Sequence, residues 1–334
     1  MLTVLEEFPR ELLEVPTSEI YKVLSGPTLI HLTGRREEPL FVSTLLHGNE
    51  DTGFVALQRL LREEWRGDLP RALSVFIGNV DAARHKRRRL DEQPDYNRIW
   101  QGGGESPEHL MMQQILTEMK NRKVFASVDI HNNTGINPHY ACVNRLQDPF
   151  FHLATLFSRT VVYFIRPQGV QSMAFAEICP AVTVECGHVG DEAGIDHAEK
   201  FLYACLHLSK VPDTPISPHD IALFHTVATI KVPKEYSFGF GKTHADLVFE
   251  RNVDHLNFNE LQPGTLMGIL SGDSRARLEV RDEQGNLVGD KFLDYSEGMI
   301  RTKVSFMPSM FTLNREVISQ DCFGYIMERM ALNL

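Results

Sequence analysis

The chain has 334 residues, 43% hydrophobic and 23% charged, which leaves room for one large soluble domain or two ordinary ones. Its formal net charge of −10 would repel a phosphate backbone, so nucleic acid is excluded as an expected partner. The five cysteines are scattered, so we expect reduced thiols. The start has no basic flank before an uninterrupted apolar stretch, and no apolar run reaches the roughly 18 residues of a membrane span. We therefore expect a cytoplasmic protein without a membrane partner.

In the first two thirds of the chain, short apolar stretches predict buried strands, and apolar residues at helical spacing predict amphipathic helices. The strands at 28–34 and 39–46, joined by the turn at 35–38, are expected to form a hairpin that opens the sheet. The other predicted strands span 73–79, 124–130, 160–165 and 181–187, and the predicted helices span 52–66, 107–121, 151–157 and 194–208. This alternation is typical of an α/β fold with helices on both faces of the sheet.

After the proline-rich segment at 212–218 the pattern changes to short strands separated by turn residues. This change predicts a second, smaller and mainly β domain. We expect residues 1–215 to form the first domain and residues 216–334 the second. The strands expected in the second domain span 227–232, 266–270, 276–280 and 303–306.

Polar side chains stand where three of the predicted strands end. His47 and Glu50 follow the strand at 39–46, His131 follows the strand at 124–130, and Glu185 lies in the strand at 181–187. Ligands of an open α/β sheet bind outside the carboxyl ends of its strands, so we expect these residues to meet at one edge. Two imidazoles and one carboxylate, with a fourth position open to water, make a hydrolytic zinc site. Glu185 suits the general base that takes a proton from the metal-activated water.

A histidine three residues before a glutamate is a weak signal by itself, and a lone histidine at a strand end is more often a satisfied core or loop residue. The combination of three strand ends favours the metal site. Asp129, two residues before His131, is a candidate for a carboxylate that orients this ligand. Cys142 and Cys186 have no neighbours in sequence that would lower a thiol pKa, so we expect them to be structural.

Four short blocks resemble, in order and spacing, the motifs of the succinylglutamate desuccinylase/aspartoacylase family, which belongs to the zinc carboxypeptidase superfamily. The blocks are His47-Gly48-Asn49-Glu50, Asn79 with the later Asp95-Tyr96-Asn97-Arg98, Asp129-Ile130-His131-Asn132-Asn133-Thr134, and Val184-Glu185-Cys186-Gly187. They span roughly residues 40 to 190. The resemblance implies a zinc-carboxypeptidase-like mixed sheet flanked by helices, with a smaller mainly β C-terminal domain.

The resemblance also implies roles for single residues. His47, Glu50 and His131 would bind one Zn²⁺ per chain, and Glu185 would activate water. Asn97 and Arg98 fall on the pair that grips a substrate carboxylate, and Arg88 falls on the arginine that polarises the scissile carbonyl. Asn132, in the third block, is included among the predicted substrate-binding residues.

The residues themselves agree in part with these roles. The planar guanidinium of Arg98 matches a carboxylate bidentately, and Asn97 can donate beside it. Arg88 belongs to the run 84–89, which also fits a solvated loop, and the choice among Arg87, Arg88 and Arg89 stays open. The aspartoacylase-like arginine upstream of the catalytic glutamate is absent from 171–175, so an acyl-aspartate with two carboxylates is not the expected substrate.

The preferred interpretation is a zinc-dependent amidohydrolase (a deacylase) that removes the acyl group from a small N-acyl amino acid or a similar carboxylate. The near alternative is a zinc carboxypeptidase that acts on peptides. Two histidines and a carboxylate also form the facial triad of iron oxygenases, and a metal-binding protein without turnover is a further alternative. The oligomeric state is left open, a homo-oligomer included.

Overall fold

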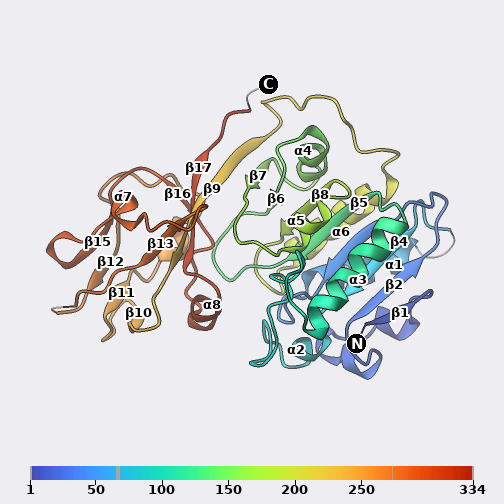
Figure 1. Cartoon of the computed structure of the whole chain (residues 1–334), viewed down its shortest axis with the longest axis horizontal. Helices are drawn as coiled ribbons and strands as arrows, with labels where there is room; N and C mark the ends of the chain where they lie inside the picture. The colour runs from blue at the N-terminus through green and yellow to red at the C-terminus, as the bar shows by residue number, and fades with distance from the viewer. Residues whose placement is uncertain (1, 65–67, 273, 333–334) are drawn as a thin grey trace. The chain divides into compact units, whose positions relative to one another are not determined.

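The computed structural model describes residues 2–64, 68–272 and 274–332 (Figure 1). The chain forms two compact units. The first unit comprises Met1–Asn132, His139–Ala222 and Leu332–Leu334, and the second comprises Asn133–Pro138 and Leu223–Ala331. No helix among the described residues is both long and apolar enough to cross a membrane.

The first unit is built on a mixed sheet whose described strands follow the order β1-β2-β4-β3-β5-β8-β6-β7. The four strands at its centre, β4, β3, β5 and β8, run parallel to one another, whereas β2 pairs antiparallel with β4 and β6 antiparallel with β8. The strands are β1 Thr3–Leu5, β2 Thr28–Leu32, β3 Leu40–Thr44, β4 Leu73–Ile77, β5 Ala126–His131, β6 Tyr140–Val143, β7 Thr160–Tyr163 and β8 Ala181–Glu185.

The central strands are buried along their whole length, as parallel strands covered on both faces require. On one face Gly53, in the first turn of α1, packs against Ile130 of β5; on the other, Phe175 of α5 stacks on Phe41 of β3 with ring centroids 4.3 Å apart. The α-helices of this unit are α1 Thr52–Glu64, α2 Val80–Arg84, α3 Pro107–Asn121, α4 Asp148–Thr155, α5 Gln171–Phe175 and α6 Glu192–His207, with 3-10 turns at η1 Arg10–Leu13 and η2 Thr17–Lys22.

The second unit is mainly β. In one group of strands β17 and β13 pair antiparallel with β9, and β16 pairs with β17; the other group follows the order β10-β11-β12-β15-β14. A stack of aromatic rings, Phe249 on Phe323 and Phe323 on Phe311, fills its core. The elements are β9 Ala222–Lys231, β10 Phe238–Phe240, β11 Leu247–Phe249, η3 Val253–Leu256, β12 Leu266–Leu270, β13 Glu279–Asp282, α7 Gly289–Phe292, β14 Leu293–Asp294, η4 Ser296–Gly298, β15 Met299–Thr302, β16 Met307–Ser309, α8 Arg315–Gln320 and β17 Gly324–Arg329.

The predicted fold class is confirmed: a mixed α/β unit and a separate, mainly β C-terminal region. The division into units falls after Ala222, a few residues beyond the boundary expected from composition, and it assigns Asn133–Pro138 to the second unit. The last two residues of the helix predicted over 52–66 lie outside the described residues.

The predicted opening hairpin is wrong. β4 lies between β2 and β3 in the sheet, so the two strands of the expected hairpin do not pair. All five residues of β3 are buried, and such a strand belongs at the centre of a sheet, where both of its edges are paired with parallel neighbours. The strand predicted at 303–306 is also wrong, because these residues connect β15 to β16.

Gly53 tests how tightly α1 is packed on β5. A Cβ atom at this position would lie 2.8 Å from Cβ of Ile130, so Gly53→Ala is expected to lower the free energy of unfolding by about 1–3 kcal/mol through overpacking. Urea denaturation measures this change. Gly26→Ala is the control, because a Cβ there meets nothing within 4 Å, and it should stay within about 0.5 kcal/mol of the parent. Equal unfolding free energies for the two variants would contradict the close packing.

Candidate metal centre

The candidate centre is assembled at the carboxyl ends of β3, β5 and β8. In the ladder between β5 and β8, His131 pairs in register with Glu185, and in the ladder between β3 and β5, Ser43 pairs with Asp129. The chain leaves β3 through Leu45, whose φ of 56° lies in the left-handed region and turns the backbone sharply toward His47. Parallel pairing therefore brings the predicted residues to one edge of the sheet, as expected from the sequence.

The loop that carries His47 and Glu50 is held closely against α2. The backbone N–H of Asn79 donates to the carbonyl oxygen of Leu45 at 2.6 Å, and a Cβ on Gly48 would overlap the backbone nitrogen of Ala83. Only glycine fits at position 48 without moving α2. This close approach fixes the loop between the two predicted ligands.

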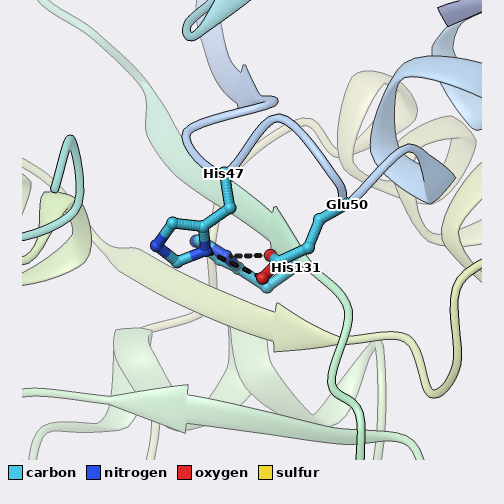
Figure 2. Close-up of side chains that lie close together, drawn as sticks. All are labelled: His47, Glu50 and His131. Atoms are coloured by element: carbon cyan, nitrogen blue, oxygen red, sulfur yellow. Dashed lines mark hydrogen bonds and ion pairs between the residues drawn. The ribbon is translucent and has the colours of Figure 1, made fainter. Parts of the chain in front are cut away.

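His47, Glu50 and His131 converge on one point (Figure 2). Nδ1 of His47 lies 2.8 Å from Oε1 of Glu50, and Nδ1 of His131 lies 2.7 Å from Oε2 of the same carboxylate. One ligand atom from each residue lies within 4.8 Å of the others, and all three side chains are buried. In the part of the chain that the structure describes, this is the one group of His, Cys, Asp and Glu residues close enough to share a metal ion.

Each imidazole directs its other nitrogen at a second carboxylate. Nε2 of His47 lies 3.1 Å from Oδ1 of Asp95, and Nε2 of His131 lies 2.7 Å from Oδ2 of Asp129, whose Oδ1 accepts a hydrogen bond from Ser43. Metal-binding histidines typically use their remaining N–H in this way, which fixes the tautomer and the ring orientation. The pattern leaves Nδ1 of both histidines facing the Glu50 carboxylate, which makes these two atoms the candidate ligand atoms. Asp129 lies against His131, as its position two residues before this histidine predicted.

Charge couples the members of this cluster. Burial by itself would raise the pKa of Glu50, but the adjacent His47 and His131 lower it well below its usual range. Burial also opposes the charge on His131, yet Asp129 and Glu50 raise the pKa of its imidazole well above its ordinary value. Two imidazole nitrogens and one carboxylate are a donor set that suits Zn²⁺, and a bound cation would compete with protons for these atoms.

Glu185 lies beside this group. Its position opposite His131 in the ladder puts both side chains on the same face of the sheet, on neighbouring strands, and Glu185 is only 7% exposed. The neighbouring thiols are poor candidates for a nucleophile, because burial, with a contribution from the Glu185 carboxylate, holds the pKa values of Cys142 and Cys186 well above the ordinary thiol value. All five cysteines are buried and free of disulfides.

The structure separates the three candidate arginines. Arg88 donates from Nε and Nη2 to Oδ2 of Asp95 at 3.2 and 2.9 Å, and its Nη1 lies 3.7 Å from Oε1 of Glu50. Arg87 pairs instead with the exposed carboxylate of Asp91, and Arg89 donates to the carbonyl oxygen of Gln93. Among the described contacts of these three arginines, those of Arg88 reach a predicted ligand.

Asn97 reaches the centre, whereas the side-chain amide of Asn132 is engaged elsewhere and only its backbone N–H donates to Oε2 of Glu50, at 3.3 Å. Nδ2 of Asn97 lies 3.1 Å from Nε2 of His131, and Nη1 of Arg98 donates to the backbone carbonyl of Asn97 at 2.8 Å. Asn132 donates from Nδ2 to Thr52 and to the carbonyl of Gly187, and its Oδ1 accepts from the backbone N–H of Thr52. These bonds tie the loops after β5 and β8 to the start of α1, and the predicted substrate contact of Asn132 stays a prediction.

Sequence reasoning assigned no role to Asp95, which contacts both His47 and Arg88. The sequence feature that could have identified Asp95 is its place in the Asp95-Tyr96-Asn97-Arg98 block, two residues before Asn97. Burial tends to raise the pKa of this carboxyl, but Arg88 and His47 hold it well below its usual value. These two partners favour the ionised form of this partly buried carboxylate, which restrains both of them.

The fold and the cluster together define an α/β protein with a candidate metal centre at the carboxyl edge of a mixed sheet. A family model described as the succinylglutamate desuccinylase/aspartoacylase catalytic domain matches residues 38–210. Because this match covers more than half of the chain, the protein belongs to that family, and the family predicted from the four sequence blocks is confirmed.

Solved structures share the fold. The succinylglutamate desuccinylase/aspartoacylase from Rhodobacter sphaeroides has 14% identity and a TM-score of 0.60, with 90% of this chain and 88% of that chain covered. The succinylglutamate desuccinylase from Chromobacterium violaceum has 16% identity and a TM-score of 0.55 over 89% and 87%. Murine aminoacylase 3 has 13% identity and a TM-score of 0.52 over 89% and 97%. A search of curated proteins finds no match.

The hydrogen bond from His131 to Asp129 predicts a measurable effect on metal affinity. Asp129→Asn removes the carboxylate that orients the imidazole, so zinc affinity should fall about 10- to 100-fold. Competition with a chromogenic chelator measures this affinity. Asp91→Asn, which alters an exposed carboxylate paired with Arg87, is the matched control and should bind zinc like the parent. Unchanged zinc affinity in Asp129→Asn would rule out the orienting role.

Proposed function

We propose that the protein is a zinc-dependent hydrolase that cleaves the amide bond of a small N-acyl amino acid. One zinc ion per chain would be held by Nδ1 of His47, by the carboxylate of Glu50 and by Nδ1 of His131. The observation that carries the proposal is the register of β5 and β8, which sets the carboxylate of Glu185 beside this triad. Zinc at such ligands acts as a Lewis acid and lowers the pKa of a bound water to about 7.

Glu185 is the proposed general base and acid. It would accept a proton from the attacking water and then pass that proton to the leaving amine, so one carboxylate serves both halves of the reaction. The surroundings of Glu185 support this role, because its side chain is buried beside His131 on the face of the sheet that carries the triad. A buried carboxylate in this position is kept from bulk water and close to the reacting atoms.

Arg88 is the proposed donor to the carbonyl oxygen as negative charge develops on it. Its guanidinium is held by Asp95 and stands 3.7 Å from the Glu50 carboxylate, which places positive charge next to the triad before substrate arrives. A donor fixed in advance contributes most to catalysis, because it needs no reorganisation during the reaction.

Arg98 and Asn97 are the proposed partners of the substrate carboxylate. A guanidinium can hold a carboxylate through two parallel hydrogen bonds, and the Asn97 amide, next to His131, can donate beside it. The description of the matched family and the name aminoacylase carried by a similar structure favour deacylation over peptide hydrolysis.

A panel of N-acyl amino acids tests the proposal. The zinc-loaded protein should hydrolyse at least one N-acetyl or N-succinyl amino acid. The release of the free amine measures this hydrolysis. Peptides with a free C-terminal carboxylate form the second arm of the panel. Hydrolysis of peptides alone would replace the deacylase by a carboxypeptidase, and hydrolysis of neither class would refute the proposed function.

The role of Glu185 has its own test. Glu185→Gln keeps the size of the side chain and removes the base, so the rate on the best substrate should fall at least about a hundredfold. Zinc content, measured on the same preparation, should equal that of the parent. A rate equal to the parent's with zinc retained would remove Glu185 from the mechanism.

Arg88 and Arg87 form a matched pair of variants. Arg88→Ala should lower kcat about 10²- to 10³-fold, the effect of one well-placed donor, with zinc still bound. Arg87→Ala removes an equal charge one residue away, where the arginine pairs with the exposed Asp91, and should keep kcat within about twofold. Equal losses in both variants would show that the effect comes from the net charge of the loop.

A further inference from the structure

The turn Asp95–Arg98, called here the clamp turn, connects both histidines of the candidate centre. Oδ1 of Asp95 lies 3.1 Å from Nε2 of His47. Nδ2 of Asn97 lies 3.1 Å from Nε2 of His131, a close contact and not a hydrogen bond, because the N–H of that imidazole nitrogen is directed at Asp129. The backbone N–H of Asn97 donates to Oδ1 of Asp95 at 2.8 Å, which closes the turn. A shift of this turn therefore moves the proposed carboxylate partners relative to the metal ligands.

The clamp turn rests on a second stretch of chain, Gly169–Gln171, called here the backing segment. The backbone N–H of Gln171 donates to Oδ1 of Asn97 at 2.8 Å, which leaves the NH₂ group of Asn97 facing His131. The backbone N–H of Trp100 donates to the carbonyl of Gly169 at 2.9 Å, and the N–H of Gly169 donates to Oε1 of Gln101 at 3.0 Å. These three bonds bracket Arg98 on both sides.

Gly169 is the point where the two stretches touch most closely. Its φ is +79°, a conformation that side-chain-bearing residues rarely adopt, and a Cβ atom there would overlap the backbone carbonyl of Arg98. The overlap involves main-chain atoms, which cannot rotate away as the end of a flexible side chain can. Any side chain at position 169 must therefore displace Arg98 or the backing segment.

We propose that Gly169 is a positioning residue for the recognition of the substrate carboxylate. It lets the backing segment approach the clamp turn closely enough to fix Asn97 and to seat the backbone of Arg98, and these two residues then present their donors in one geometry. The inference rests on the proposed function, because it assigns Gly169 to the site that binds the carboxylate of an N-acyl amino acid. It adds a residue that contacts neither substrate nor metal.

Two glycines with nearly the same positive φ make the test specific. Gly190 has a φ of +78° and nothing within 4 Å of its virtual Cβ, so Gly190→Ala places a side chain at a positive φ, as Gly169→Ala does, but without the overlap. For each protein, kcat/KM is measured on the best N-acetyl amino acid of the panel and on its C-terminal carboxamide, which lacks the carboxylate. The ratio of the two values reports carboxylate recognition.

In Gly169→Ala the ratio of kcat/KM for the carboxylate substrate to kcat/KM for the carboxamide should fall at least about tenfold. The main cause should be a higher KM for the carboxylate substrate, because small misplacements of binding groups are costly. Gly190→Ala should keep the preference of the parent, and zinc content should be equal in all three proteins. A general loss of stability would lower both rates together and leave the ratio unchanged, so an unchanged ratio in Gly169→Ala overturns the inference.

Gln101→Ala provides a second test that inserts no atoms and serves if Gly169→Ala does not fold. It removes the side chain that accepts from the N–H of Gly169, so the backing segment loosens and the preference should fall about threefold. An unchanged preference in Gln101→Ala overturns the inference in that case.

Hydrolysis by the parent with no change in either variant refutes the role of Gly169 alone, whereas no hydrolysis by the parent refutes the proposed function and this inference together.

Discussion

The carboxylate of Glu50 between two imidazole nitrogens is the interaction on which the rest of the site depends. A buried carboxylate is costly unless it is paired, and here each of its oxygens faces one histidine. The pairing requires that the ends of β3 and β5 be neighbours, which their parallel ladder provides. It also requires a sharp, close-packed loop after β3, which the positive φ of Leu45 and the missing side chain of Gly48 allow.

The surroundings of this pair are rich in negative charge. Glu50, Asp129 and Glu185 are buried and Asp95 is partly buried, while Arg88 is the one arginine or lysine paired with Glu50 among the described ion pairs. The neighbouring carboxylates raise the pKa of His131, because a proton on its imidazole offsets one of their negative charges. A divalent cation would offset the excess more completely, which is the electrostatic argument for a metal at this position.

The convergence of the candidate metal ligands could be predicted because these residues stand at strand ends, where the sequence pattern and the sheet topology are strongly linked. His47, Glu50, His131 and Glu185 all meet as the strand pattern implied. The family resemblance pointed to Arg88, but the residues of the run alone left the choice open, since the direction of a side chain in a loop depends on partners elsewhere in the chain, such as Asp95. The failed hairpin has a similar cause: an antiparallel partner for β2 was expected nearby in sequence, but β4 supplies it.

The loop Asn133–Pro138 leaves β5 directly after His131 and Asn132, yet it belongs to the second unit. There Thr134 bonds Thr312, Asn137 accepts from the N–H of Met310, and Gly135 packs against the carbonyl of Phe311. The two units are thus interleaved along the polypeptide. In a chain that ends at residue 215 this loop would have none of these partners. Truncation or exchange of the C-terminal region would therefore also affect β5, the strand that carries His131.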